Sequence, residues 1–184
     1  MKVVAGIVFC LSCMLYATYA PFRNTVNDRV ADFRARAKGL LEAHYSPTRP
    51  SKTTAYGATK GHGPRNAVDL NTASFWAVPF DTQADKKKAI LMVEFDHIVS
   101  LDQLIVTAGG GDAFTEHGRP RQILLTFTNE ERVRLQLQDT TKPQKFSLRS
   151  AVGIKTVKIE ITDVYASDNG KDVTIAELEF FSLL

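Results

Sequence analysis

The chain has 184 residues, of which 44% are hydrophobic and 23% are charged, and its formal net charge is +3 at pH 7. This length and composition are typical of one globular domain with accessory segments. The small charge, and the lack of a stripe in which aromatic residues alternate with Lys or Arg, predict no nucleic-acid partner. Both cysteines, Cys10 and Cys13, lie in an apolar N-terminal run, so we expect neither a disulfide framework nor a catalytic thiol.

The first segment, residues 1–22, is expected to be a membrane anchor or a signal peptide. Residues 3–20 carry no charge, and a helix of that length rises about 27 Å, close to the thickness of a bilayer core. A signal peptidase would cut after Ala20, but Pro21 is a poor residue beyond the cut because it lacks an N–H. We therefore favour a single transmembrane helix, and secretion after cleavage is the alternative.

The second segment, residues 23–46, has apolar residues at helical spacing, among them Val26, Val30 and Phe33. Arginines occupy the other faces, so the prediction is a juxtamembrane amphipathic helix. It could lie on an anionic membrane surface, pack on a partner, or act as a solvated spacer. The run Ser46-Pro47-Thr48-Arg49-Pro50 breaks the helix, which places the folded domain at residues 47–184.

Period-two alternation dominates the remaining chain and predicts strands. The expected strands are residues 89–95, 99–107, 121–128, 132–138, 145–148, 156–164 and 173–182. Residues 129–131 join two of them as a hairpin, and residues 52–62 are expected to be loop with a short strand at most. Short strands separated by turns predict an all-β, antiparallel jelly-roll β-sandwich.

Enzyme signatures are missing from the sequence. It contains no G-x-S-x-G, no H-E-x-x-H and no P-loop, so we predict that the protein is not an enzyme. The weakest hypothesis is a hydrolase that uses Asp163 and Glu177 as paired carboxylates.

Three collinear motifs carry a resemblance to a known family. They are N-A-V-D-L-N-T-A-S-F-W at residues 66–76, G-R-P-R-Q-I at 118–123, and the closing stretch 161–181. Together they resemble the discoidin-like (F5/8 type C, galactose-binding-like) family, most closely its bacterial NAD glycohydrolase translocation F5/8 type C domains. The resemblance implies a non-catalytic, membrane-anchored module of the bacterial cell envelope, with its C-terminal domain outside the cytoplasmic membrane. Counted plainly, the positive-inside rule gives the opposite orientation, because five Lys or Arg closely follow the apolar span.

The resemblance also implies a structural Ca²⁺ in the first long loop. The matching positions are Asp69, Asn71, Thr72 and Glu177. Calcium takes six to eight oxygen ligands, which these side chains supply in part. The alternative is that Asp69 and Asn71 form Asx turns while Glu177 accepts loop N–H groups.

A ligand site in this family lies on loops at one end of the sandwich. The residues expected there are Phe114, Glu116, His117, Arg119, Tyr165, Asp168, Asn169 and Asp172. Aromatic faces and planar hydrogen-bonding groups are what sugar recognition needs, so the predicted ligand is a glycan or cell-envelope polysaccharide. The residue-by-residue alternatives are a solvated His117, an Arg119 paired with Glu116 or Asp163, and a Trp76 that belongs to the core. A second function is also open, in which the protein is an accessory structural subunit of a membrane-protein complex.

Overall fold

The computed structural model describes residues 45–110, 114–167 and 170–184. The predicted anchor lies outside these residues, as does nearly all of the predicted juxtamembrane helix. The helix prediction is wrong for its last two residues, since Tyr45 and Ser46 begin strand β1 (Tyr45–Pro47), which pairs with the C-terminal strand. Among the described residues, no helix is both long enough and apolar enough to cross a membrane.

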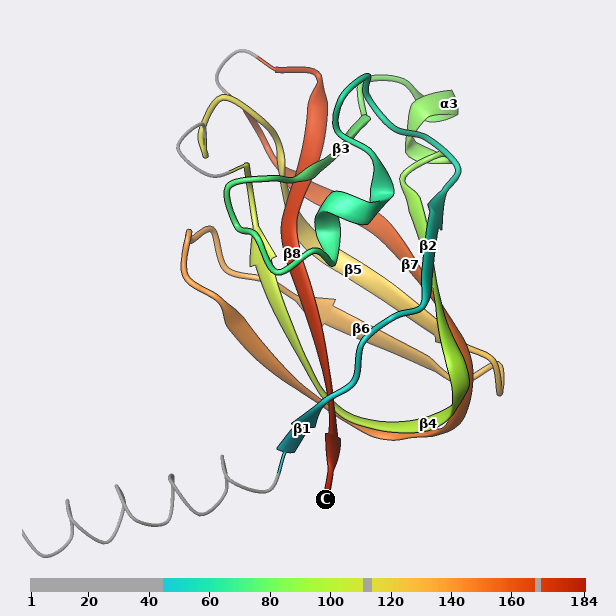
Figure 1. Cartoon of the computed structure of the whole chain (residues 1–184). Helices are drawn as coiled ribbons and strands as arrows, with labels where there is room; N and C mark the ends of the chain where they lie inside the picture. The colour runs from blue at the N-terminus through green and yellow to red at the C-terminus, as the bar shows by residue number, and fades with distance from the viewer. Residues whose placement is uncertain (1–44, 111–113, 168–169) are drawn as a thin grey trace, which may run out of the picture. The chain divides into compact units, whose positions relative to one another are not determined.

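The domain is built almost entirely of antiparallel strands, with two short helical turns (Figure 1). After β1 the elements are β2 (Lys52–Ala55), the 3₁₀ turn η1 (Pro64–Ala67), β3 (Trp76–Pro79), α3 (Gln83–Lys86), β4 (Ile90–Ala108), β5 (Arg119–Phe127), β6 (Arg132–Gln136), β7 (Gln144–Tyr165) and β8 (Asp172–Leu183). The strand order is β1-β8-β4-β7-β5-β6, with β2 added on β4 and β3 on β8.

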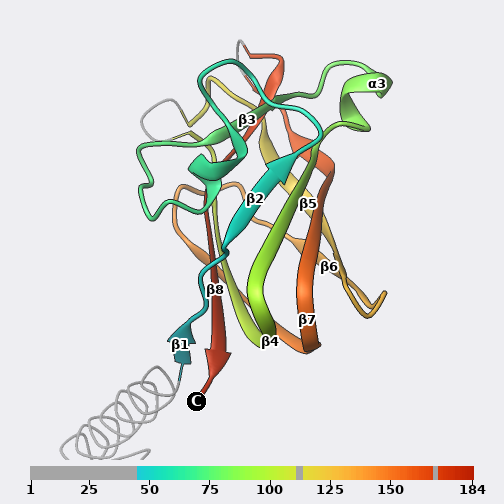
Figure 2. The same cartoon turned by 45° about the vertical axis from the view of Figure 1, so that its right-hand side comes forward.

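Strands β4 and β7 are long because each contributes to both layers of the sandwich. Residues 90–94 of β4 pair with residues 156–160 of β7 in one layer, and residues 103–106 pair with residues 144–147 in the other. Three register shifts separate the two stretches, and Figure 2 shows both strands curving together at that point. Such irregularities bend a strand without ending its ladder.

The prediction of separate strands at 89–95 and 99–107, and at 145–148 and 156–164, was therefore wrong. The alternation breaks at the bend, where His97 and Ile98 are both exposed. A break in alternation is also what a turn produces, so the sequence pattern does not distinguish a turn from a corner. The expected β5–β6 hairpin is confirmed, with Thr126 opposite Arg132 and Glu130 at a φ of 65° in the turn.

The space between the two layers is filled by the inward-facing residues of these strands. Leu91, Leu104, Ile123 and Ile159 are fully buried there. Trp76 is also fully buried and its Nε1 donates to the carbonyl of Gly57 at 3.0 Å, which confirms that it is a core residue. The loop that precedes β3 is thereby anchored to the core.

Candidate functional site

The predicted ligand residues come from loops at one end of the sandwich, where β5 begins and β7 ends (Figure 1). Arg119 and Tyr165 are opposite each other in the β5–β7 ladder. Gly118 forms an isolated bridge with Val173, and its N–H donates to the carbonyl of Asp172 at 2.8 Å. The loops before β5 and before β8 are therefore held side by side by backbone hydrogen bonds.

Arg119 is buried and directs its guanidinium into these loops. Nε and Nη2 donate to the two carboxylate oxygens of Asp139 at 3.0 and 2.7 Å, and Nη1 donates to the carbonyls of His117 and Ala166. The ring of Phe114 lies 5.1 Å from its Cζ. Asp139 is the ion-pair partner, so the expectation of Glu116 or Asp163 was wrong. The side chain joins three loop segments from within.

Asp163 instead pairs with Arg121 on the neighbouring surface. Tyr165 lies beside Arg121, with the guanidinium 5.9 Å from the ring centroid, and its hydroxyl donates to the carbonyl of Leu137 at 2.9 Å. Asp163 and Glu177 have different surroundings, since Asp163 pairs with Arg121 whereas the groups around Glu177 are those of the Asp69 loop and Glu179. Tyr165, like Arg119, has a hydrogen-bonding role inside the domain.

The open part of this end is an aromatic row of His62, Phe75 and His117. The rings of His62 and Phe75 stack with centroids 4.2 Å apart and an interplanar angle of 12°. Phe75 and His117 are 5.4 Å apart at a tilt of 50°. All three side chains are partly exposed, and Nδ1 of His117 is buried with no hydrogen-bond partner in the described part of the chain.

His62 and Phe75 were missed as site residues. A usable signal existed for Phe75, because neighbouring residues of an extended segment point in opposite directions and Trp76 was expected to be core. The remaining predicted residues form the rim of this end. Glu116 is exposed, and Asp172 accepts a hydrogen bond from the Thr59 hydroxyl at 2.9 Å. Asp168 and Asn169 lie outside the described residues.

The predicted metal loop is organised by its own side chains. Asp69 Oδ1 accepts from the N–H of Asn71 at 3.0 Å, and Asn71 Oδ1 accepts from the N–H of Ala73 at 3.1 Å. The hydroxyl of Ser74 donates to Asp69 Oδ2 at 2.7 Å, and Thr72 is exposed on the same turn. These are the Asx turns that the sequence offered as the alternative to calcium.

Glu177 faces this loop from β8 and is only 2% exposed. Its carboxylate oxygens have no hydrogen-bond partner of normal geometry among the described residues. The amides of Leu70 and Asn71 face it and lower its pKa somewhat, but burial and the charges of Asp69 and Glu179 outweigh them and raise the pKa to about 7. A buried carboxylate beside a second carboxylate favours either a proton or a cation.

This arrangement fits a calcium ion. The ion would give the orphaned Glu177 oxygens a partner and would offset the repulsion from Asp69. No group of three His, Cys, Asp or Glu gathers as a metal cluster in the described residues. Backbone carbonyls and the Asn71 and Thr72 oxygens would therefore have to complete the shell, as is common for calcium.

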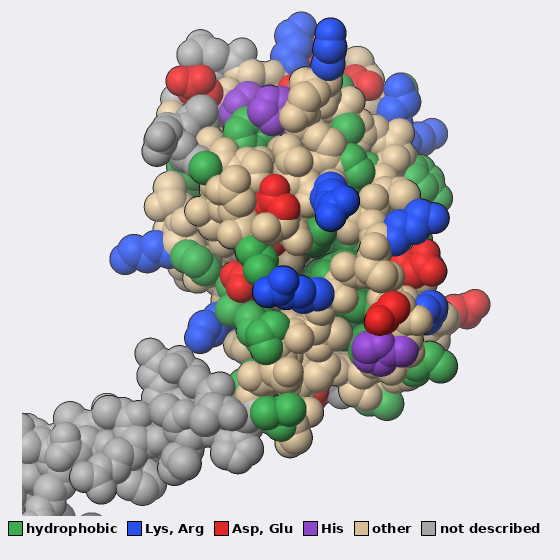
Figure 3. Space-filling view, viewed as in Figure 1, with side chains coloured by type: hydrophobic (Ala, Val, Ile, Leu, Met, Phe, Trp, Pro, Cys, Tyr) green, Lys and Arg blue, Asp and Glu red, His purple; other side chains and the backbone are tan. Residues whose placement is uncertain are grey.

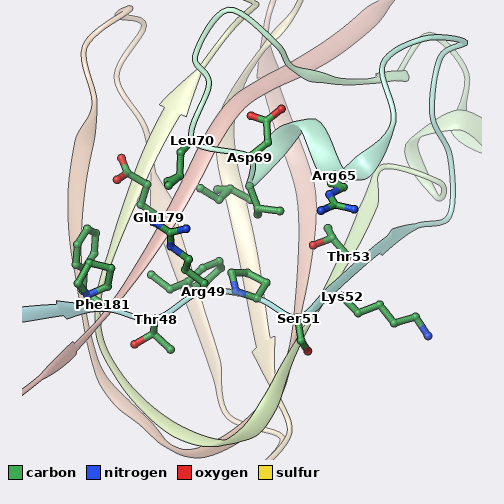
Figure 4. A pocket seen from close by; sticks show the side chains of 15 residues that line it. Thr48, Arg49, Ser51, Lys52, Thr53, Arg65, Asp69, Leu70, Glu179 and Phe181 are labelled. Atoms are coloured by element: carbon green, nitrogen blue, oxygen red, sulfur yellow. The ribbon is translucent and has the colours of Figure 1, made fainter.

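A groove of about 560 Å³ lies on the side of the domain (Figure 4), and none of the three rings of the aromatic row lines it. We call it the side groove. Its walls are the β1–β2 connection at residues 47–53, the loop around Arg65 and residues 68–70, and residues 178–181 of β8. Of the lining residues, the sequence predicted a site role for Asp69 alone, as a ligand of the metal loop.

Residues 47–181 match the NAD glycohydrolase translocation F5/8 type C domain. The match covers most of the chain, so the chain belongs to this family. The matched part is a translocation and binding module of the F5/8 type C kind and is not a catalytic domain. No curated protein sequence matches the chain.

Several solved structures share the fold. The family 32 CBM of NanJ from C. perfringens, solved with galactose, has a TM-score of 0.55 at 14% identity, covering 75% of this chain and 99% of that one. The CBM32 of AlyQ, solved with 4,5-unsaturated mannuronic acid, has a TM-score of 0.51 at 16% identity and covers 74% and 98%. An F5/8 type C domain from Bacteroides fragilis has a TM-score of 0.58 at 14% identity and covers 76% and 97%. These matches confirm the all-β antiparallel sandwich of the discoidin type.

Proposed function

We propose that the protein is a non-catalytic binding module that recognises a glycan or cell-envelope polysaccharide at the loop end of its sandwich. The observation that carries the proposal is the row of His62, Phe75 and His117. A partly exposed phenylalanine face suits the C–H face of a sugar ring, and imidazole nitrogens beside it can bond to hydroxyls.

Structural relatives agree with this class of ligand. Proteins of the same fold were solved with galactose and with an unsaturated mannuronic acid, and another is a pectin-binding module. In the present chain, the ion pair of Arg119 with Asp139 lies beneath the aromatic row, and Arg119 holds in place the loop that carries His117. The ligand would be contacted by Phe75, His117, Glu116 and Asp172, while Arg119 and Tyr165 position them.

The test is calorimetric titration of the full-length chain with galactose, N-acetylgalactosamine and purified envelope polysaccharide. Phe75→Ala and His117→Gln should each weaken saturable binding about tenfold, since an aromatic contact or a hydrogen bond to a sugar contributes about 1 kcal/mol or more. Ile98→Ala is the matched control, because Ile98 is 70% exposed on the bend of β4. If no sugar binds and a membrane protein copurifies while covering Phe114 and Tyr165, the accessory-subunit function takes its place.

The metal assignment is part of the proposal. Calcium held by Asp69, Asn71, Thr72 and Glu177 would fix the first long loop. It would thereby fix the position of Phe75, which follows Thr72 by three residues in the same connection. The ion's role would be structural, since it would supply charge to a buried carboxylate and rigidity to a loop.

The cellular location is the remaining part of the proposal. Residues 3–20 would form a single transmembrane helix, and the domain would be displayed on the extracytoplasmic side. Protease treatment of intact cells tests this arrangement, because a displayed domain is cut from the surface while a cytoplasmic one is protected. A soluble, shortened chain in the culture medium would instead show that the segment is a cleaved signal peptide.

A further inference from the structure

The side groove carries cations that the fold itself does not use. Arg49 and Arg65 line it, and the guanidinium of neither makes a hydrogen bond or an ion pair within the part of the chain that the structure describes. This contrasts with Arg119 and Arg121, which both have carboxylate partners. Figure 4 shows Arg49 and Arg65 approaching the groove from its two walls, with Thr53 below Arg65. Two unpaired guanidinium groups on opposite walls of one groove favour an anionic occupant.

The rest of the lining is mixed in character. Thr53 and Ser51 bring hydroxyl groups, while Leu70 and Phe181 bring apolar surface. Asp69 and Glu179 add two carboxylates to the lining, and Figure 4 shows Glu179 on the same side of the groove as Arg49 and Leu70. The face seen in Figure 3 shows the same mixture, with basic, acidic and hydrophobic side chains interleaved across its middle. An occupant that suits this lining has an anionic group, several hydroxyls and an apolar ring face.

The rim residue Leu70 has an unusual conformation. Its φ is 63°, in the left-handed region that a bulky residue rarely adopts, and its side chain is 56% exposed. The Asx turns of the preceding and following residues hold it there. Strained backbone that presents an exposed apolar side chain at a groove is common where a ligand binds.

The backbone that lines the groove disfavours a peptide strand as occupant. The β1–β2 connection is hydrogen-bonded on both sides, since Thr48 N–H donates to Phe180 and Ser51 N–H donates to Glu94. An added peptide strand needs a free sheet edge, whereas this wall offers mainly side chains. Saccharides are recognised through side chains of this kind.

We propose that the side groove is a second binding site, which takes a carboxylate-bearing saccharide through Arg49 and Arg65. Each arginine would pair with a sugar carboxylate, Thr53 and Glu179 would bond to ring hydroxyls, and Leu70 would pack on a ring face. The site lies apart from the aromatic row, so it does not depend on the ligand proposed for the loop end.

The test uses a short oligogalacturonate and its methyl-esterified, uncharged counterpart, each titrated into the full-length chain. Arg49→Gln and Arg65→Gln should each weaken binding of the acidic chain about tenfold or more, because a charge-assisted hydrogen bond is lost. Arg134→Gln is the control, since Arg134 is an exposed arginine on the outer strand β6. Leu70→Gly should also weaken binding. The thermal stability of this variant should be unchanged or higher, because glycine adopts a positive φ without steric strain.

Each outcome decides the matter. Weaker binding in Arg49→Gln and Arg65→Gln, together with weak binding of the esterified chain, supports the site. Equal binding of the two saccharides, unchanged binding in both arginine variants, or equal binding of poly-glutamate overturns it.

If Phe75→Ala abolishes oligogalacturonate binding while Arg49→Gln does not, the acidic sugar binds at the loop end, and the side-groove proposal fails while the proposed function stands. If the arginine variants lose the acidic sugar but no ligand responds to Phe75→Ala, the loop-end function fails and the side groove stands.

Discussion

Arg119 and Asp139 form a two-pronged ion pair, with Nε–Oδ1 and Nη2–Oδ2 distances of 3.0 and 2.7 Å, across twenty residues of sequence. The same guanidinium donates to the carbonyls of His117 and Ala166. The loop before β5, the connection after β6 and the loop after β7 therefore meet at one buried side chain. The geometry of the loop end depends on this contact.

Replacement of Arg119 by alanine should destabilise the domain by about 2–3 kcal/mol, because it removes a buried donor that satisfies two loop carbonyls and the Asp139 carboxylate. For a domain of this size that corresponds to a Tm lower by about 5–10 °C. Arg121→Ala is the matched control, since its pair with Asp163 is much more exposed and such pairs contribute less than about 1 kcal/mol. Thermal unfolding of both variants checks the prediction, and equal losses of Tm would contradict it.

Glu177 should make stability fall as pH rises. Its pKa in the folded domain is about 7, above the ordinary value of 4.5, so the native state holds the proton more tightly than the unfolded chain does. The contribution to stability is complete below pH 4.5 and is lost as pH rises through 7. Glu177→Gln should remove this dependence, so it should stabilise the metal-free protein at pH 8 by on the order of 2–3 kcal/mol relative to wild type.

Urea unfolding in chelator at pH 5 and pH 8 measures that difference. Glu131→Gln serves as control, because Glu131 is exposed in the β5–β6 hairpin. A Glu177→Gln variant whose stability changes with pH as much as that of wild type would show that the carboxyl titrates normally.

Calcium should stabilise wild type above pH 7, where Glu177 is ionised and lacks a partner. A ligand at about 100 times its Kd adds about 2.7 kcal/mol to the free energy of unfolding. Asp69→Asn keeps the oxygen that forms the Asx turn but removes the charge, so the turn should survive while the calcium response is lost. Thermal unfolding in calcium and in chelator checks this, with Glu177→Gln as a second unresponsive variant. An identical Tm in both conditions for wild type would refute a calcium site in this loop.

Gly109 and Gly153 provide a matched pair of glycines with positive φ. Their φ angles are 89° and 73°, but a Cβ on Gly109 would clash with the Phe114 ring, while one on Gly153 would meet nothing within 4 Å. Gly153→Ala should therefore cost only the backbone strain, about 1 kcal/mol. Gly109→Ala should cost more and should also move Phe114 off Arg119. Unfolding free energies of the two variants decide this, and equal losses would show that the ring yields without cost.

Much of the fold was predictable from local pattern. Alternation placed the strands of the β5–β6 hairpin and of β8, because a half-buried strand needs every second residue apolar. The short elements β3 and α3 were missed, since four residues are too few to establish a period. The capping box of Thr82 and Asp85 at the start of α3 was the readable signal for that turn.

The candidate sites were predictable only in part. The motif at 66–76 led to the metal loop, and Glu177 could be assigned to it through the family resemblance alone. The side groove had no sequence signal, because Arg49, Arg65 and Glu179 are scattered and surface arginines are common. Likewise, the sequence around Arg119 did not show which carboxylate is its ion-pair partner. Glu116 is nearer in the sequence than Asp139, yet Asp139 is the partner and Asp163 pairs with Arg121.

The sequence by itself determined the class of fold, the family and the turn chemistry of the Asp69 loop, because periodicity and short-range hydrogen bonds are properties of neighbouring residues. Only the tertiary structure decided which distant side chains meet. It made β4 and β7 continuous around a corner, paired Arg119 with Asp139, and aligned His62 with Phe75 and His117. It also left the guanidinium groups of Arg49 and Arg65 without a partner among the described residues. These outcomes depend on sheet bending and register, which are set by packing of the whole core and not by any one segment.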